Sequence, residues 1–482
     1  MSVQMSIVTQ PAQFLSTQRG KLTLVLLCAV AFVDFVDASI VNIALPSMQK
    51  ALHLSVQGLE WVPGGYLLTY GGFMLLGGRA ADLLGRRRVL LAGVVLIGCS
   101  SFVGGLAGTS GVLIGARLVQ GLGAALTLPA ALSILTTSFG DGPDRHRALG
   151  VWGAMAGIGS IAGVLFGGLL TEGPGWRWVL FVNPIIVLLL LAPIIRLLPD
   201  ERGEGQLRNF DALGALLATG GMVLLVYALV QAPSQGWGAG TTIGELAGAA
   251  GLLALFVVNE LRHSNPLAPL SIFKINGLGF ADLTQLTVFI GFFSLFFFLT
   301  LYMQEVLHYS AIKTGLAYLP LCVAVGVSSG IASQLLVKVG TRAVMVSGAL
   351  IAAGGLFWLS HLSVHATFLA NILPGTLLAS LGIGAVFVGV ATAANSGVPA
   401  DKAGLAAALL NASQQLGGAL GLAILTAVAT SRTRHLLGAH ANTAHALASG
   451  FHLALLLGSV FIAASAIVAL KATNTKGELE TD

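Results

Sequence analysis

The chain has 482 residues, of which 56% are hydrophobic and 9% charged, and its formal net charge is +5. A soluble protein carries about 25% charged residues. This composition therefore excludes a soluble protein, because too few charged residues remain to cover a water-facing surface. The basic residues are not gathered on one polar domain, which argues against a nucleic-acid-binding protein. The three cysteines are widely separated within apolar runs and offer neither a disulfide framework nor metal-ligand spacing; they are Cys28, Cys99 and Cys322.

Fourteen apolar runs follow one another along the chain. A helix of about 20 residues crosses the hydrocarbon of a bilayer, so we expect an all-α integral membrane protein with fourteen transmembrane helices. The expected spans are 22–45, 58–78, 89–108, 111–138, 148–170, 178–198, 212–231, 243–259, 278–304, 314–337, 343–360, 367–394, 404–430 and 450–470. The first run is too long for the apolar region of a signal peptide, and we expect it to be retained as a span.

The distribution of Lys and Arg between the loops predicts the orientation. With the N-terminus inside, 18 of the 24 basic residues fall in inner loops and tails and five in outer loops. Inner loops of membrane proteins are enriched in these residues. Both termini are therefore expected in the cytoplasm, in a bacterial cytoplasmic membrane.

The first span carries two acidic residues, Asp34 and Asp37, three positions apart. A charged Asp at the centre of a membrane helix costs roughly 2.5–3.5 kcal/mol, and residues at this spacing share one helix face. Arg117 of the fourth span lies at a similar depth to Asp37, within about 5 Å at 1.5 Å per residue. We expect an ion pair or a shared water between Asp37 and Arg117; an arginine reaching the outer interface is the alternative.

Other polar or special residues stand on the later spans. Gly159, Gly163 and Gly167 recur every four residues on the fifth span, which predicts close approach of another helix. Asp282 lies early in the ninth span, where it could face either the cavity or the inner membrane interface. Three outer-loop histidines are five residues apart, a spacing that predicts no metal site; they are His435, His440 and His445.

Several side chains are candidates for lining a substrate cavity. Trp61 lies at the start of the second span, where an interfacial anchor is the alternative. Phe292 and Phe296 belong to an aromatic face of the ninth span that suits flat, lipophilic cations, with lipid-facing phenylalanines as the alternative. Asn411 and Gln414 of the thirteenth span could orient a substrate or join helices by hydrogen bonds.

Two segments repeat within the chain. RAADLLGRRRVLLAG, after the second span, is echoed by SQLLVKVGTRAVMVSG, after the tenth, with Gly340 at the place of Gly85 and Arg342 at the place of Arg87. Corresponding elements run in the same direction, which predicts two parallel six-helix halves with a substrate site between them. The expected divisions are an N-terminal tail at 1–21, a six-helix bundle at 22–198, a linker with two extra helices at 199–276, a second bundle at 277–470 and a tail at 471–482.

These motifs together resemble the major facilitator superfamily, and within it the fourteen-span drug:proton antiporter family. VDASIVNIALP resembles that family's first-span signature, and RLVQGLGAA its fourth-span motif with a buried arginine. GRAADLLGRRR resembles the superfamily's inner-loop motif, with Leu83 in place of the usual basic residue. GSIAGVLFGG resembles the fifth-span antiporter motif, with Val164 in place of the usual proline.

The resemblance implies the major facilitator fold and a transporter, not an enzyme. In the inner-loop motif Gly85 permits a tight turn and Asp82 pairs with nearby arginines, so we expect a gate that latches the inner side of the two halves. A simple positive-inside anchor would not need the motif's acid and glycines. The gating residues implied are Gly78, Asp82, Gly85, Arg86 and Arg87.

The expected function is proton-coupled export of lipophilic, cationic drugs or antibiotics by alternating access. A carboxylate pair beside an arginine can take up and release a proton as its water access changes; Asp37 carries the family match, and Asp34 is the better candidate for contacting a cationic substrate. We expect no cofactor and no metal, since the proton gradient drives transport. The expected partners are the substrate, protons and the lipid bilayer, and the chain is expected to be a monomer. The alternative is a proton-coupled exporter or importer of one metabolite on the same fold.

Overall fold

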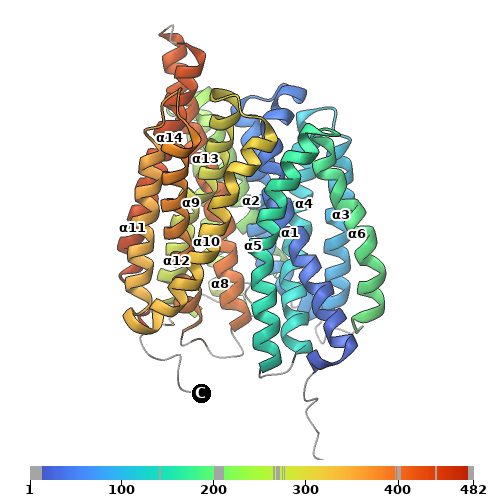
Figure 1. The fold of residues 1–482 in the computed structure, drawn as a ribbon. Helices are drawn as coiled ribbons and strands as arrows, with labels where there is room; N and C mark the ends of the chain where they lie inside the picture. Colours follow the sequence, from blue (N-terminus) through green and yellow to red (C-terminus); the bar gives the residue numbers. More distant parts are fainter. Residues whose placement is uncertain are drawn as a thin grey trace, which may run out of the picture.

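In the computed structural model the chain is a bundle of long helices (Figure 1). The structure describes residues 14–139, 143–199, 211–263, 266, 272–273, 275, 277–396, 398, 403–439 and 442–475. These residues form fourteen α-helices and no β-strand. The helices are α1 Gln18–Leu52, α2 Val56–Leu84, α3 Arg86–Gly105, α4 Ser110–Ser138, α5 Pro143–Glu172, α6 Arg177–Leu197, α7 Ala212–Gln235, α8 Gly240–Arg262, α9 Leu278–Leu301, α10 Ala311–Val339, α11 Thr341–Leu359, α12 Leu373–Asn395, α13 Ala403–Gly438 and α14 Thr443–Ala469.

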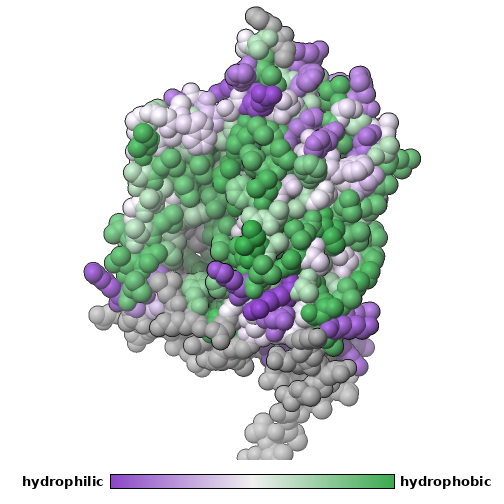
Figure 2. Space-filling view, turned by 90° about the vertical axis from the view of Figure 1, so that its left-hand side faces the viewer, coloured by the Kyte–Doolittle hydropathy of each residue, from purple (hydrophilic) through white to green (hydrophobic). Residues whose placement is uncertain are grey.

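The expected all-α membrane fold with fourteen helices is confirmed. Thirteen of the helices are long and apolar enough to cross a membrane. The exception is α2, whose 29 residues include Pro63, Tyr66 and Tyr70. Figure 2 shows the corresponding surface, an apolar band between two more hydrophilic ends.

Several helices extend beyond the expected spans: α1 ends at Leu52 and not at 45, α2 ends at Leu84 and not at 78, and α14 begins at Thr443 and not at 450. α13 continues to Gly438, about two turns beyond the expected end of the thirteenth span at residue 430. Arg432, Arg434 and His435 therefore lie on this helix and not in an outer loop. A short π-helical segment, Tyr302–Val306, extends α9.

The two halves of the bundle lie on either side of α5 and α10. Figure 1 shows α1, α3, α4 and α6 on one side and α9, α11, α12 and α14 on the other. α5 packs on both α1 and α10, and α2 packs on both α4 and α13. The extra helix α7 contacts α2 and α13, while α8 packs on α7. α1 begins and α14 ends at the same end of the bundle, which we call the terminal end; the opposite end is the distal end.

The repeated loops have the same geometry in both halves. Gly85 ends α2 with φ 99°, and Gly340 ends α10 with φ 86°, backbone conformations that favour glycine. The Arg87 side chain donates to the carbonyl of Leu198 at 3.0 Å, just beyond α6. The Arg342 side chain donates to the carbonyl of Ala472 at 2.7 Å, just beyond α14. Each arginine therefore satisfies a free carbonyl at the end of the last helix of its own half.

Polar contacts join the two halves at the distal end. The Gln304 side chain donates to the carbonyl of Ile43 at 3.0 Å. The Glu172 carboxylate accepts from the backbone N–H of Ile312 at 3.0 Å. Lys50 and Glu305 form an ion pair at 3.3 Å. The structure is thus closed at its distal end.

Candidate functional site

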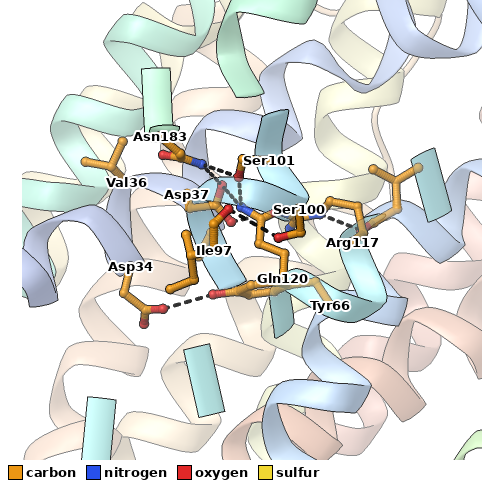
Figure 3. Close-up of polar contacts among 12 residues, drawn as sticks. Asp34, Val36, Asp37, Tyr66, Ile97, Ser100, Ser101, Arg117, Gln120 and Asn183 are labelled. Carbon is orange, nitrogen blue, oxygen red and sulfur yellow. Dashed lines mark hydrogen bonds and ion pairs between the residues drawn. The ribbon is translucent and has the colours of Figure 1, made fainter. Parts of the chain in front are cut away.

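The carboxylate of Asp37 lies at the centre of a buried polar network (Figure 3). One of its oxygens pairs with Arg117 Nη1 at 2.7 Å. The other accepts from Gln120 Nε2 at 2.7 Å and from Asn183 Nδ2 at 2.5 Å. Helices α1, α4 and α6 supply these groups, so the network joins three helices of the N-terminal half.

The network is closed to its surroundings and almost fully hydrogen-bonded. Arg117 is 1% exposed and Asp37 3%. The Arg117 side chain also donates to the carbonyl of Val62 at 3.0 Å and to Gln120 Oε1 at 2.7 Å. Ser101 of α3 accepts from Gln120 at 2.7 Å. Because a charge buried without partners is very costly, these contacts explain how an arginine and an aspartate persist within a membrane span.

The second acid of α1 has different partners. Asp34 accepts hydrogen bonds from the hydroxyl of Tyr66 at 3.1 Å and from that of Tyr70 at 2.8 Å. The two tyrosines are one helical turn apart on α2, and their rings meet edge to face. The expected pair with Arg117 therefore forms at Asp37, while two tyrosine hydroxyls that the sequence did not single out hold Asp34.

Tyr66 connects the two acids. Its ring lies under the guanidinium of Arg117, with Cζ of the arginine 4.3 Å from the ring centroid, while its hydroxyl donates to Asp34. A cation beside an aromatic face is attracted by the ring quadrupole. Arg117 and one aromatic ring thus connect Asp37 with Asp34 by direct contacts.

Sequence reasoning did not assign a role to Tyr66, Tyr70, Ser101, Gln120 or Asn183. The sequence did hold a clue to these residues. A polar side chain within an apolar span costs free energy in the membrane and so points to a function or to a polar partner. The sequence alone does not show which helix faces meet, and so it does not connect Asn183 of α6 with Asp37 of α1.

The stripe of glycines on α5 faces α1. A Cβ at Gly159 would lie 2.8 Å from the Cβ of Phe35, and one at Gly167 would lie 2.8 Å from the carbonyl of Ile40. At Gly163 it would lie 1.9 Å from the hydroxyl of Ser39. This close approach holds the helix that carries both acids against α5.

The arginines of the inner-loop motif contact their own half. Arg86 donates to the hydroxyl of Thr137 on α4 at 3.2 Å, and Arg87 to the end of α6. Gly78 faces Pro129 of α4. The side chain of Asp82 lies outside the described part of the structure. A latch between the halves at this motif therefore stays a prediction.

Two of the candidate cavity residues, Phe292 and Gln414, contact side chains on other helices. Phe292 is 8% exposed, and its ring meets Phe296 and Phe387 of α12, so it packs within the protein and does not face lipid. Gln414 accepts from Gln285 of α9 at 3.1 Å, which joins two helices.

The remaining candidates have few partners. Asn411 donates to the carbonyl of Ala407 on its own helix. Trp61 is half-buried beside Gly65. Asp282 is 5% exposed and, among the described residues, its carboxylate has no hydrogen-bond partner. A group of three or more residues suited to hold a metal ion is also absent from the described part of the chain.

Comparison with known proteins assigns the family. The sequence pattern of the Major Facilitator Superfamily matches residues 27–422. The puromycin resistance protein pur8 of Streptomyces alboniger is 40% identical over 431 residues, which cover 89% of this chain and 85% of that protein. The cephamycin export protein CmcT of Amycolatopsis lactamdurans is 41% identical over 423 residues, covering 86% of each chain.

Among solved structures, a bacterial homolog of the human lysosomal transporter Spinster has the same fold, with a TM-score of 0.66 at 16% identity and coverage of 94% of this chain and 97% of that one. The helical architecture, the buried ion pair and these similarities all indicate the same family. The chain belongs to the Major Facilitator Superfamily, a family of membrane transporters and not of enzymes, and within it to the group that includes antibiotic resistance and export proteins.

Proposed function

We propose that this chain exports lipophilic drugs or antibiotics in exchange for protons. Relatives named for puromycin resistance and cephamycin export, about 40% identical over most of the chain, support export of this class of molecule. The observation that supports proton coupling is the buried Asp37–Arg117 pair, joined through Tyr66 to a second acid.

The proposed cycle uses the division of the two acids. With the distal end closed, Asp37 is neutralised by Arg117 and Asp34 is held by two tyrosine hydroxyls. A cationic substrate that approaches Asp34 from the cytoplasm competes with a proton for the carboxylate. Opening of the distal end then lets substrate leave and a proton enter. One charge crossing 100 mV supplies about 2.3 kcal/mol, enough to bias the exchange between the two states.

The proposed setting is a bacterial cytoplasmic membrane, with the terminal end in the cytoplasm. The excess of Lys and Arg in the loops of that end supports this orientation. We propose that a single chain transports without a cofactor, driven by the proton gradient.

The test uses Asp37→Asn in inside-out vesicles with a lipophilic dye or puromycin as substrate. Export into the vesicle lumen should depend on the proton gradient in the wild type and lose that dependence in the variant, because an amide at position 37 cannot neutralise Arg117, and the uncompensated cation then acts on proton and substrate exchange at Asp34. Glu245→Gln on α8 is the matched control, since it removes a carboxylate far from α1. Unchanged coupling in Asp37→Asn would overturn proton exchange at this site.

A narrower function is the second candidate, export of one natural product. CmcT and the tetracenomycin C resistance and export protein of Streptomyces glaucescens are each named for one compound class. Growth of an efflux-deficient host carrying this chain, tested against several unrelated antibiotics and dyes, separates the two. Protection against one compound class supports the narrow function, and broad protection supports the first.

A further inference from the structure

Glu60 is a buried acid that the proposed site does not use. It lies on α2, near the distal end, and is 0% exposed. Neither of its carboxylate oxygens has a hydrogen-bond partner among the described residues. Its Oε1 lies 2.5 Å from the place where a Cβ of Gly64 would stand, so the carboxyl group lies along the helix in space that the glycine leaves open.

The face of α2 that carries Glu60 packs against α13. Gly71 meets Gln415, and about two turns further toward the distal end Gly64 meets Leu422. The numbering falls on one helix as it rises on the other, so the two helices are antiparallel. Continued at 3.6 residues per turn, this register places Glu60 opposite Thr426.

Three further polar side chains belong to the same interface. Gln57 lies one turn before Glu60 on α2, and Thr426 and Thr430 lie one turn apart on the facing side of α13. All three are at least nine-tenths buried, and the Gln57 amide nitrogen and both threonine hydroxyls lack a hydrogen-bond partner among the described residues. We call these three residues and Glu60 the α2–α13 seam.

A negative charge on Glu60 would be costly here, because a carboxylate buried without a partner loses its hydration and gains nothing in return. A neutral carboxyl group can instead donate its proton to a threonine hydroxyl and accept from the Gln57 amide. Among the described residues, the register of the two helices thus sets three neutral polar groups, and no cation, on the helix faces beside Glu60. We propose that Glu60 is a second proton-binding site, which takes up a proton as the α2–α13 seam closes and releases it as the seam opens.

This site is separate from the network on α1. Arg117 approaches α2 on another face, at the carbonyl of Val62 and the ring of Tyr66, and holds Asp37 there. The helices around Glu60 carry further charged or titratable groups, among them Asp34 and Lys50 on α1, Tyr70 and Arg79 on α2 itself, Tyr227 on α7 and, at the distal end of α13, Arg432, Arg434 and His435. The seam itself holds one acid and three neutral polar groups, a set that suits a proton better than a metal ion, which prefers several charged ligands.

The inference rests on the proposed function only in requiring that the halves alternate between a state closed at the distal end and one open there. The closed state binds one more proton than the open state. Raising the pH should therefore favour the open state, by at most about tenfold in the ratio of the two states per pH unit for one proton.

The experiment measures the opening directly. Spin labels at Ala51→Cys and Leu437→Cys, one at the distal end of each half, are introduced after replacing Cys28, Cys99 and Cys322 by alanine. The distance distribution between them is recorded by double electron–electron resonance in lipid nanodiscs from acid to alkaline pH. The wild type should shift toward longer distances as the pH rises. Glu60→Gln should open less than the wild type as the pH rises, because the site on α1 still titrates but Glu60 no longer does, while the control Glu245→Gln should behave as the wild type.

Each outcome decides the proposal. A pH response of the label distances in Glu60→Gln equal to that of the wild type overturns the proposal. The proposal is also overturned if the label distances in the wild type respond to exchange of NaCl for choline chloride and not to pH, because the site would then bind Na⁺ and not H⁺. If the amide variant does not reach the membrane, Glu60→Asp replaces it, and an unmoved pH midpoint contradicts the proposal. The labels report on Glu60 whether or not any drug is exported, so failure of the wild type to export drugs would reject the proposed function alone.

Discussion

The guanidinium of Arg117 lies over the ring of Tyr66, and the hydroxyl of the same ring donates to Asp34. Arg117 itself pairs with Asp37. One aromatic side chain thus touches the partner of one acid and holds the other acid. This arrangement explains why two carboxylates occupy a single turn of α1: they are not redundant, because each has its own partners and Tyr66 lies between them.

The hydroxyl of Tyr66 should matter for transport more than for folding. Tyr66→Phe keeps the ring beneath Arg117 and removes one hydrogen bond to Asp34. A hydrogen bond to a charged group contributes about 1.5–3 kcal/mol, so the initial rate of gradient-driven efflux should fall by roughly tenfold or more while the variant stays folded. Dye efflux from vesicles measures this, with Tyr227→Phe of α7 as control. A wild-type rate in Tyr66→Phe would show that Asp34 acts without this hydroxyl.

Lysine should not replace Arg117. The arginine reaches Asp37, Gln120, the carbonyl of Val62 and the ring of Tyr66 at once, and a single ammonium group cannot match the planar fork. Arg117→Lys should therefore destabilise the protein by about 1–3 kcal/mol, the cost of leaving buried polar groups unpaired. Thermal unfolding in detergent is the measurement. The exposed Arg432→Lys serves as control, and an equal melting temperature for both variants would contradict the prediction.

The packing of α1 on α5 should not tolerate a methyl group at Gly163. In Gly163→Ala the new Cβ would lie 1.9 Å from the hydroxyl of Ser39 and 2.8 Å from the carbonyl of Val36, so the helices must separate. Such overpacking costs about 1–3 kcal/mol, which should lower the melting temperature.

Gly157→Ala is the matched control on the same helix, because a Cβ there meets nothing within 4 Å. Its melting temperature should not fall. Adding Ser39→Ala to Gly163→Ala should restore only part of the loss, since the contact with the Val36 carbonyl remains. Equal stability of Gly163→Ala and Gly157→Ala would show that α5 can move away from α1 at little cost.

The ion pair at the distal end should contribute little. The Lys50 side chain is 71% exposed, and exposed pairs contribute about 0–1 kcal/mol, so Glu305→Gln should leave stability nearly unchanged. Gln304→Leu should cost more, about 1–3 kcal/mol, because it removes the donor to the buried Ile43 carbonyl. Thermal unfolding of the two variants side by side is the measurement. A larger loss in Glu305→Gln than in Gln304→Leu would reverse this ranking.

Most of the helical architecture could be predicted from the sequence, because bilayer thickness imposes a length on every apolar run. The fourth expected span, 111–138, differs from α4 by a single residue at its start. The extension of α13 was missed because its last two turns contain arginines and a histidine, and hydropathy does not distinguish a helix that continues into water from a loop.

The candidate site was predictable only in part. The depths of Asp37 and Arg117 along their spans follow from helix rise, and their ion pair was expected. The positions of Tyr66 and Asn183 depend on the rotation of α2 and α6 about their axes, which apolar spans do not encode because most of their faces are alike. The aromatic face of α9 shows the same limit: the spacing of Phe292 and Phe296 was evident, but not that other aromatic rings would cover Phe292.

The low hydropathy of α2 has a consequence for how the nascent chain is inserted into the membrane. Among the fourteen described helices it is the one that length and composition do not mark as able to enter a bilayer, yet it packs on α4 and α13. When α2 leaves the ribosome, neither of those helices has been synthesised. We therefore expect α2 to complete its insertion only once α4 has been synthesised and can pack on it. Substitutions that weaken the contacts of Arg117 with α2 would then appear first as degraded, half-inserted chains.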